Sequence, residues 1–258
     1  MPELPEAETI ARSLRGAVAG RTIVSARFLA KRVSKDDPAQ LSGRIIRSVG
    51  RHGKQLLLEL DRGYLHVKLG MTGALLVNGV ATDYTRAILE FEDGSHLLYE
   101  DIRQFGSLSL LAVPPSGLGP DPLELTAAGF AAGLRQKRGR MKALLLNQAF
   151  LRGLGNIYVD EALFRAGLHP LARAERLTRE RAEQLHACIV ELLEEAIAHR
   201  GSSISDYVDA SGERGSFQKL HRVYGREGQA CVTCGGPIQR VVVAQRGTHF
   251  CPHCQRKR

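Results

Sequence analysis

The sequence predicts an α+β protein in which an N-terminal helix and an antiparallel β-sandwich precede a helical domain that ends in a zinc-ribbon hairpin. Three observations lead to this fold class. Short runs rich in aliphatic or β-branched residues fill positions 22–113, the apolar period becomes helical after a Pro- and Gly-rich stretch, and four cysteines form two close pairs near the C-terminus. With 258 residues, the chain is long enough for two domains that each bury a core.

The N-terminal helix is predicted over residues 6–19, where Ile10, Leu14 and Val18 recur at four-residue spacing. Turn signals such as Asn78-Gly79 separate the short runs that follow, and this spacing is typical of a sandwich or flattened barrel. The predicted strands are residues 22–28, 43–49, 55–60, 64–69, 74–77, 87–91, 96–99 and 107–113.

The second part of the chain begins after residues 114–122, whose prolines and glycines predict a domain boundary. Helices are expected at 141–150, 157–166 and 179–200, and the Gly- and Ser-rich residues 201–217 are expected to form a mobile loop. The predicted division is a β-sandwich domain at 2–115, a hinge at 116–125, a helical domain at 126–227 and a zinc finger at 228–258.

Composition places the chain among soluble globular proteins, with 43% hydrophobic and 24% charged residues. Its longest uncharged apolar runs are much shorter than the roughly 18 residues that a membrane span needs. Glu3, Glu6 and Glu8 occupy positions where a secretory signal would be basic. We therefore expect a cytoplasmic protein that makes no contact with a membrane.

The net charge of +9 is distributed unevenly. Residues 1–115 hold 15 basic and 13 acidic side chains, whereas residues 116–258 hold 21 and 14. Two stretches, at 135–142 and from 219 to the end, are basic with almost no acid. Such clusters favour a polyanionic partner, of which nucleic acid is the commonest in the cytoplasm, but a solvated basic surface explains them equally well.

Four of the five cysteines form the pattern Cys231-x2-Cys234-x16-Cys251-x2-Cys254. Two close pairs on a short hairpin can arrange four thiolates tetrahedrally around one Zn²⁺, and such ribbons are usually structural. Disulfide pairing is the alternative, which a cytoplasmic location disfavours. Cys188 falls on the apolar side of a predicted helix and is expected to pack in the core.

The N-terminus itself is a candidate reactive group. Removal of Met1 would leave Pro2 with a secondary α-amine whose pKa, near 8 for a free terminus, keeps a useful fraction unprotonated at neutral pH. Such an amine forms a cationic iminium with an aldehyde-type carbon, and Glu3 and Glu6 lie within one helical turn for proton transfer. From these residues alone, the alternative is that Pro2 and Pro5 merely begin a helix.

Five segments, in order along the chain, resemble the formamidopyrimidine-DNA glycosylases, the Fpg branch of the Fpg/Nei family. The first segment is the N-terminal Met-Pro-Glu-Leu-Pro-Glu, and the others are the family's lysine-bearing strand, its Leu-Gly-Met-Ser-Gly turn, its helix–two-turn–helix signature and its zinc finger. In this sequence they are residues 1–9, 51–58, 69–73, 153–164 and 223–254. The resemblance covers almost the whole chain.

This resemblance implies a bifunctional DNA glycosylase/AP lyase that excises oxidised purines, such as 8-oxoguanine and formamidopyrimidines, from duplex DNA. Pro2 would attack C1′ of the damaged nucleotide, Glu3 would protonate the sugar ring oxygen, and Glu6 would support the proton transfers. The iminium would then permit β- and δ-elimination. The implied partner is duplex DNA with an oxidised base or an abasic site, and the implied cofactor is one structural Zn²⁺ held by the four paired cysteines.

The resemblance also assigns DNA contacts. Met71 and Phe105 match residues that fill the gap left by a flipped nucleotide, and Arg103 matches the residue that faces the orphaned base. An apolar wedge beside a multiply donating arginine suits that task. Without the resemblance, core packing would be the expected role of Met71 and Phe105.

Lys54 and Arg246 match phosphate ligands that we count among both the catalytic and the DNA-binding residues, and Asn156 matches a phosphate ligand in the helix–two-turn–helix. Lys68 is a DNA-binding candidate where the family usually has histidine. The alternatives are a solvent-facing strand position for Lys54 and a helix cap for Asn156.

Two other functions stay open. A Nei-like enzyme would prefer oxidised pyrimidines, although Leu4 and the Leu-Gly-Met turn favour the Fpg branch. A catalytically inert binder of damaged DNA would not need the Pro2-Glu3 pair. Gln104 and Ser216 also depart from the family pattern, and they leave the damaged-base preference open. We expect a monomer in the bacterial cytoplasm, associated with the nucleoid through DNA.

Overall fold

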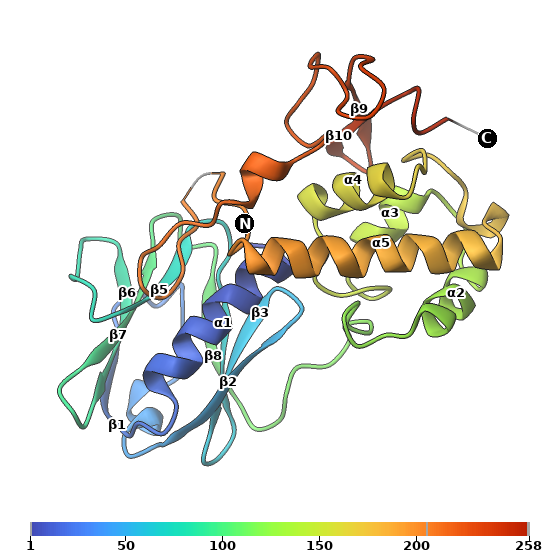
Figure 1. Cartoon of the computed structure of the whole chain (residues 1–258). Helices are drawn as coiled ribbons and strands as arrows, with labels where there is room; N and C mark the ends of the chain where they lie inside the picture. Colours follow the sequence, from blue (N-terminus) through green and yellow to red (C-terminus); the bar gives the residue numbers. More distant parts are fainter. Residues whose placement is uncertain (1, 205, 257–258) are drawn as a thin grey trace. The chain divides into compact units, whose positions relative to one another are not determined.

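The computed structural model describes residues 2–204 and 206–256 (Figure 1). Contacts divide the chain into two compact units. The first contains Met1–Ser116 and His199–Gln218, and the second contains Gly117–Ala198 and Lys219–Arg258. Within the described residues, no helix is both long and apolar enough to cross a membrane.

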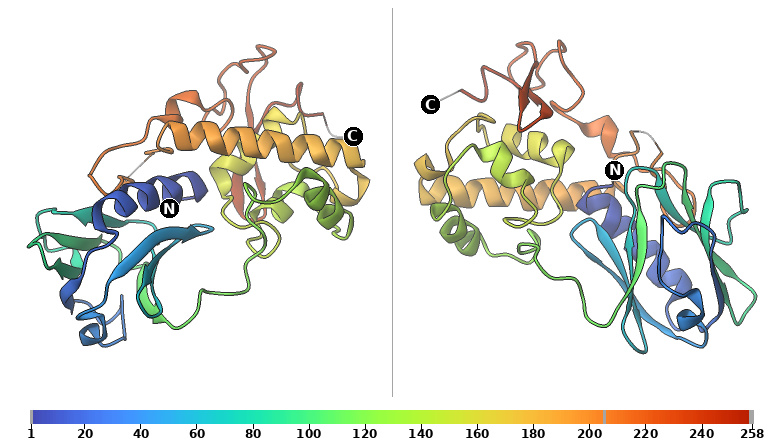
Figure 2. Two further views of the ribbon diagram at one scale, coloured as in Figure 1. Left: turned by 60° about the horizontal axis from the view of Figure 1, so that its bottom comes forward. Right: turned by 180° about the vertical axis from the view of Figure 1, so that it is seen from behind.

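The first unit begins with α1 (Leu4–Val18), which packs along strands β2 and β3 of the sandwich (Figure 2). Glu3 caps its N-terminus and Pro5 lies in its first turn, where the missing N–H has no helical partner to lose. The predicted apolar residues Ile10, Leu14 and Val18 are all buried. Burial of this apolar stripe stabilises the helix.

Two antiparallel four-stranded sheets form the sandwich, so the structure confirms the predicted fold class. One sheet has the order β1-β6-β7-β5 and the other has the order β2-β3-β4-β8. The strands are β1 (Ile23–Phe28), β2 (Ile46–His52), β3 (Gln55–Leu60), β4 (Tyr64–Lys68), β5 (Gly73–Val77), β6 (Thr85–Phe91), β7 (His96–Asp101) and β8 (Ser107–Leu111), and the short helix η1 (Pro38–Leu41) lies between β1 and β2. Alternating burial, clearest in β6, directs every second side chain into a core shared with α1.

The chain passes between the two sheets twice at one end of the sandwich. Register pairs Lys68 of β4 with Ser107 of β8, and Gly73 of β5 with Asp101 of β7. In one sheet β4 pairs with β8, and in the other β5 pairs with β7. The β4–β5 and β7–β8 connections therefore lie next to each other.

Among the described residues, 199–204 and 206–218 belong to the first unit, whereas 201–217 were expected to form a mobile loop of the helical domain. Val77 N–H donates to the Ala210 carbonyl at 3.0 Å, and Ala210 N–H donates to Ser13 Oγ at 3.3 Å. Asp209, only 1% exposed, accepts from the backbone N–H groups of Ser211 and Glu213. The hydrogen bonds that fix this segment to α1 and β5 are long-range in sequence, so composition could not show them.

The second unit is built from helices and a two-stranded hairpin. The predicted helices at 141–150, 157–166 and 179–200 form. The first and third end earlier than predicted, the second begins and ends one residue earlier, and the helix α2 was not predicted. The elements are α2 (Ala127–Arg135), α3 (Met141–Leu146), α4 (Asn156–Arg165), η2 (Ala174–Arg176), α5 (Arg179–Ala198), β9 (Gln239–Val243) and β10 (Arg246–Phe250). Thr126 Oγ1 accepts from Gly129 N–H and caps α2, a signal that two glycines inside the helix obscured.

A buried ion pair connects three elements of the second unit. Lys142 Nζ lies 2.6 Å from Asp160 Oδ1, and both side chains are fully buried. Asp160 Oδ2 accepts from His249 N–H at 2.9 Å, so α3, α4 and β10 meet at this pair. Lys142 belongs to the basic stretch at 135–142, and its burial removes it from the charged surface that we inferred there.

We predict that Lys142→Ala lowers the free energy of unfolding by about 3–5 kcal/mol, because Asp160 would remain buried without its cation. Urea denaturation followed by circular dichroism measures the change. The matched control is Lys137→Ala, which removes an exposed lysine from the same stretch and should change stability by less than about 0.5 kcal/mol. Equal losses in the two variants would contradict a structural role for the pair.

Candidate functional site

The predicted reactive terminus is buried at the start of α1. Glu3 is 4% exposed and Glu6 is 2% exposed, and Pro2 is also buried. Glu6 Oε2 accepts from Glu3 N–H at 2.7 Å, which fixes the backbone directly after Pro2. Met1, whose removal would free the amine, lies outside the described residues.

The same Glu6 carboxylate binds the segment 199–218. Its Oε1 accepts from Ser202 N–H at 2.7 Å. Gly201 has a φ of +76°, and a Cβ at this position would lie 2.6 Å from Glu6 Oε1, so only glycine fits. Burial and the charge of Glu6 raise the pKa of Tyr207 in the same segment, and the phenol donates to the Arg200 carbonyl at 3.0 Å.

Lys54 lies in the β2–β3 turn and not within a strand, because Gly53 before it adopts a φ of +65°. Lys68 ends β4 and is exposed. His66, on the same strand as Lys68, is buried and bonds Gln55 Oε1 at 2.6 Å. Burial, with the nearby charge of Lys68, lowers the pKa of His66 to about 4, so this histidine is neutral at pH 7.

Met71, Arg103 and Phe105, which we call the void-filling set, lie on the two connections between the sheets. Met71 is 45% exposed and Phe105 is 53% exposed, so neither packs in the core. The Arg103 guanidinium lies 4.8 Å from the centre of the Phe105 ring, and its Nη1 lies 3.4 Å from Met71 Sδ. Three side chains from two separate connections thus form one exposed cluster.

In the second unit, Asn156 begins α4 directly after the turn that contains Gly153. Its Nδ2 donates to the Gly247 carbonyl at 2.9 Å, and Lys142 Nζ donates to the same carbonyl at 3.2 Å. Gly247 follows Arg246, so these bonds fix the hairpin beside the predicted phosphate ligand.

Arg246 is exposed at the first position of β10, after a two-residue turn. Ala244 and Gln245 in this turn have φ values of +50° and +58°. Such a turn matches the twist of the hairpin but is unfavourable for residues with a Cβ. The conformation of this turn sets the direction in which the Arg246 side chain points away from the hairpin.

The four paired cysteines converge as a metal site. Their Sγ atoms all lie within 4.8 Å of one another, with 3.8 Å between Cys231 and Cys254 and 3.4 Å between Cys234 and Cys251. A tetrahedron with Zn–S bonds of about 2.3 Å has S···S edges of about 3.8 Å. These separations exceed the S–S bond length of about 2.0 Å, so the geometry fits Zn²⁺ and not disulfides.

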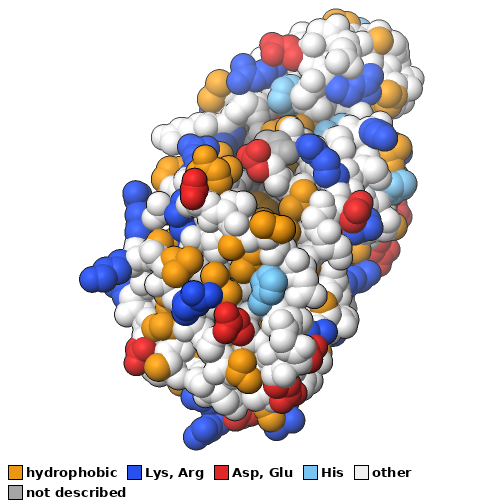
Figure 3. All heavy atoms as spheres, turned by 90° about the vertical axis from the view of Figure 1, so that its left-hand side faces the viewer, with side chains coloured by type: hydrophobic (Ala, Val, Ile, Leu, Met, Phe, Trp, Pro, Cys, Tyr) orange, Lys and Arg blue, Asp and Glu red, His pale blue; other side chains and the backbone are white. Residues whose placement is uncertain are grey.

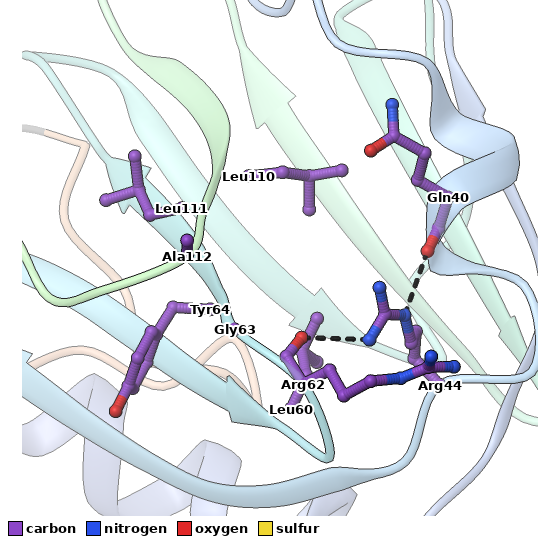
Figure 4. Close-up of a pocket in the computed structure, with 9 residues that line it drawn as sticks. All are labelled: Gln40, Arg44, Leu60, Arg62, Gly63, Tyr64, Leu110, Leu111 and Ala112. Atoms are coloured by element: carbon purple, nitrogen blue, oxygen red, sulfur yellow. Dashed lines mark hydrogen bonds between the residues drawn. The ribbon is translucent and has the colours of Figure 1, made fainter.

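Two cavities, one in each unit, have a lining that includes none of the predicted site residues except Cys254. A cavity of about 340 Å³ in the first unit lies between Gln40, Tyr64 and Leu110 (Figure 4). Its Arg44 donates to the carbonyls of Gln40 and Arg62. A second cavity, of about 750 Å³, lies in the second unit next to Cys254. Figure 3 shows a face on which acidic, basic and apolar side chains are mixed, without a continuous basic surface.

Sequence reasoning missed several residues that hold the site in place. Asp101, Lys142, Asp160 and Glu161 are buried charged side chains. Glu161 on α4 accepts from three consecutive backbone N–H groups at residues 222–224, before the zinc hairpin. Lys142, Asp160 and Glu161 have partners that are distant in the sequence, as does Asp101 through Thr72. Only charge inside an apolar helical stretch could have indicated Asp160 and Glu161.

The fold and these residues define a two-unit protein with a β-sandwich, a helical unit and a structural zinc finger. Three family models match: the formamidopyrimidine-DNA glycosylase N-terminal domain at residues 1–108, the formamidopyrimidine-DNA glycosylase H2TH domain at 118–208, and the zinc finger found in FPG and IleRS at 228–256. The chain belongs to the formamidopyrimidine-DNA glycosylase family.

Similar proteins cover the full chain. A formamidopyrimidine-DNA glycosylase of Solibacter usitatus is 50% identical over 266 residues, which cover 100% of both chains. A Lactococcus lactis FPG mutant in complex with a Fapy-dG containing DNA has a TM-score of 0.91 and 34% identity, and covers 99% of this chain and 100% of its own. The Lactococcus lactis Fpg bound to an abasic site containing DNA has a TM-score of 0.90 and 34% identity with the same coverage.

We predict that Cys251→Ser abolishes stoichiometric zinc binding, because a tetrahedral site that loses one thiolate loses most of its affinity. The metal content of purified protein, measured by a colorimetric chelator after denaturation, should be about one zinc per chain for the wild type. Cys188→Ser is the matched control, since this thiol lies on α5 outside the cluster. An unchanged zinc content in Cys251→Ser would contradict the site.

Proposed function

We propose that this chain excises oxidised purines, such as 8-oxoguanine and formamidopyrimidines, from duplex DNA and then cleaves the strand, with Pro2 as the nucleophile. Membership of the glycosylase family and the similarity to Fpg complexes with Fapy-dG and abasic-site DNA support this function. The supporting observation within the chain is Pro2-Glu3, fixed by the buried Glu6.

The reaction requires the damaged nucleotide to leave the base stack, which costs a few kcal/mol. The unprotonated Pro2 amine then attacks C1′, the C1′–base bond breaks, and the base departs with the bonding electrons. The nitrogen loses its proton and the departing base gains one, so the charges balance. Glu3 donates a proton to the ring oxygen as the sugar opens, which leaves a C=N⁺ iminium between Pro2 and C1′.

The iminium withdraws electrons from C2′ and acidifies its protons. Loss of one C2′ proton expels the 3′ phosphate by β-elimination, and loss of a C4′ proton then expels the 5′ phosphate by δ-elimination. We propose that Glu6 supports these transfers, because it holds the backbone of Glu3 at hydrogen-bond distance. The chemistry uses an amine and acids, and zinc supports only the finger.

The void-filling set would replace the extruded nucleotide, with Met71 and Phe105 in the stack and Arg103 toward the orphaned base. Lys54, Lys68, Asn156 and Arg246 would bind the backbone, with Lys54 and Arg246 gripping phosphates next to the reacting sugar. Exposure of Lys68, Arg103 and Arg246 is consistent with these contacts. The division at 2–115, 116–125, 126–227 and 228–258 stays a prediction for the functional domains, while contacts group 199–218 with the first unit.

Two other functions make different predictions for the same assays. A Nei-like enzyme would process an oxidised pyrimidine faster than 8-oxoguanine, and an inert binder would form no covalent complex with either. We further propose that the protein acts as a monomer in the bacterial cytoplasm, where it associates with the nucleoid through DNA.

We predict that borohydride traps a covalent complex between the wild-type protein and a duplex that carries 8-oxoguanine, because hydride reduces the iminium to a stable amine. Pro2→Gly should lose the complex, while Pro5→Ala should retain it. Denaturing gel electrophoresis measures the trapped fraction, and intact mass should show that Met1 is absent. Trapping of Pro2→Gly at the wild-type level would contradict the role of Pro2, and no complex with 8-oxoguanine, oxidised pyrimidine or abasic DNA would contradict the enzyme function.

We predict that Arg246→Ala weakens DNA binding across sequences and flattens the dependence of log K on log salt by about one unit, because one phosphate contact is lost. Fluorescence anisotropy over a salt series measures the slope. Arg179→Ala removes an equal charge from α5, where Arg179 pairs with Glu183, and should leave the slope unchanged. Equal slopes for wild type and Arg246→Ala would argue against a phosphate contact.

A further inference from the structure

The void-filling set depends on two short connections that the sandwich brings together. Met71 lies in a tight turn between β4 and β5, which Gly73 N–H closes by donating to the Leu69 carbonyl at 2.9 Å. Arg103 and Phe105 lie between β7 and β8. Neither connection has strand hydrogen bonds of its own, so another interaction must hold the three side chains in place.

Asp101, at the end of β7, makes this connection. Its side chain is fully buried. Oδ1 accepts from the Thr72 hydroxyl at 2.6 Å, and Oδ2 accepts from Gly106 N–H at 2.9 Å and from Tyr99 Oη at 3.2 Å. One carboxylate therefore binds the residue after Met71 and the residue after Phe105.

Thr72 carries the connection to the third member of the set. Its Oγ1 donates to Asp101 and accepts from Arg103 N–H at 3.1 Å. The hydroxyl is thus a bridge between the carboxylate and the backbone of Arg103. A side chain of the same shape without the hydroxyl would break both bonds.

Close backbone packing leaves little freedom for this arrangement. Gly70 has a φ of +61°, and a Cβ at this position would lie 2.7 Å from Gly106 N and Phe105 C. A Cβ at Gly106 would collide with Tyr99 Oη and the Lys68 carbonyl. The two connections therefore touch backbone to backbone, and a shift of one displaces the other.

The Asp101 carboxylate has hydrogen-bond donors but no cation. Among the described residues, no basic side chain forms an ion pair with it, and its partners are a hydroxyl, a phenol and a backbone N–H. A buried charge stabilised by several neutral donors is costly to leave unsatisfied. This cost favours the arrangement of the two connections in which all three donors reach the Asp101 carboxylate.

We propose that Asp101, acting through Thr72 and Gly106, is the positioning residue that holds Met71, Arg103 and Phe105 in the geometry needed to fill the gap in the DNA. The proposal rests on the proposed function of the void-filling set. Holding these side chains before DNA binds reduces the entropy lost on insertion. Asp101 does not touch DNA, so its effect is confined to steps that need insertion.

Thr72→Val tests the bridge, because valine has nearly the same shape and lacks the hydroxyl. A duplex with 8-oxoguanine opposite cytosine requires insertion, whereas a single strand with an abasic site has no stacked partner to replace. We expect the single-turnover rate on the duplex to fall about 10-fold or more, since bonds to charged groups are lost. Strand cleavage of the single-stranded substrate should stay within about twofold of wild type.

Matched variants separate positioning from general stability. Thr72→Ser keeps the hydroxyl and should restore most of the duplex rate. Thr82→Val removes an exposed threonine hydroxyl in the β5–β6 connection, which donates to Glu100 Oε2 of β7. This control should leave both rates unchanged. Asp101→Asn should reduce the duplex rate like Thr72→Val, and thermal melting identifies any variant that fails to fold.

A double-mutant cycle shows whether Thr72 acts through Met71. In a Met71→Ala background, Thr72→Val should change the duplex rate by less than about threefold, because the side chain that it positions is absent. Additive effects would overturn the proposal, as would equal losses on duplex and single-stranded substrates. If the wild type cleaves neither substrate, the proposed function fails instead.

Discussion

The Glu6 carboxylate is the interaction on which the first unit depends most directly. One oxygen accepts from Glu3 N–H and the other from Ser202 N–H, both at 2.7 Å, and Glu6 itself is only 2% exposed. A buried carboxylate that loses such donors is strongly destabilised, so the start of α1 and the segment 199–218 are fixed together. Gly201 is required because a Cβ would occupy the space of Glu6 Oε1. The carboxylate next to the proposed nucleophile therefore also holds the segment 199–218 against the start of α1.

Buried charges organise the rest of the candidate site in the same way. Asp101 joins the two connections between the sheets, and Lys142 with Asp160 joins three elements of the second unit. None of these carboxylates needs to touch DNA. They place exposed side chains, such as Met71 and Arg246, that would touch it. The net charge of the chain is therefore a poor guide to the binding surface, because part of the basic stretch at 135–142 is internal.

The sequence was sufficient to predict what depends on local pattern. The strands follow from alternating burial and turn residues, and the zinc site follows from the spacing of Cys231, Cys234, Cys251 and Cys254. The contact between Met71 and Arg103 could not be predicted from pattern, because it depends on the register of four strands. For the same reason, the attachment of residues 199–218 to the first unit was missed: its bonds to Glu6, Ser13 and Val77 span more than 100 residues. Such bonds leave no periodic signal.

The central claim is that Pro2 is the residue that bonds to the sugar. Tandem mass spectrometry of the borohydride-reduced complex, after proteolysis and nuclease digestion, tests it most directly. We expect the N-terminal peptide to carry the sugar remnant, with fragment ions that place the added mass on Pro2. A remnant on Lys54, or on any other lysine, would contradict the mechanism even if the protein cleaves damaged DNA.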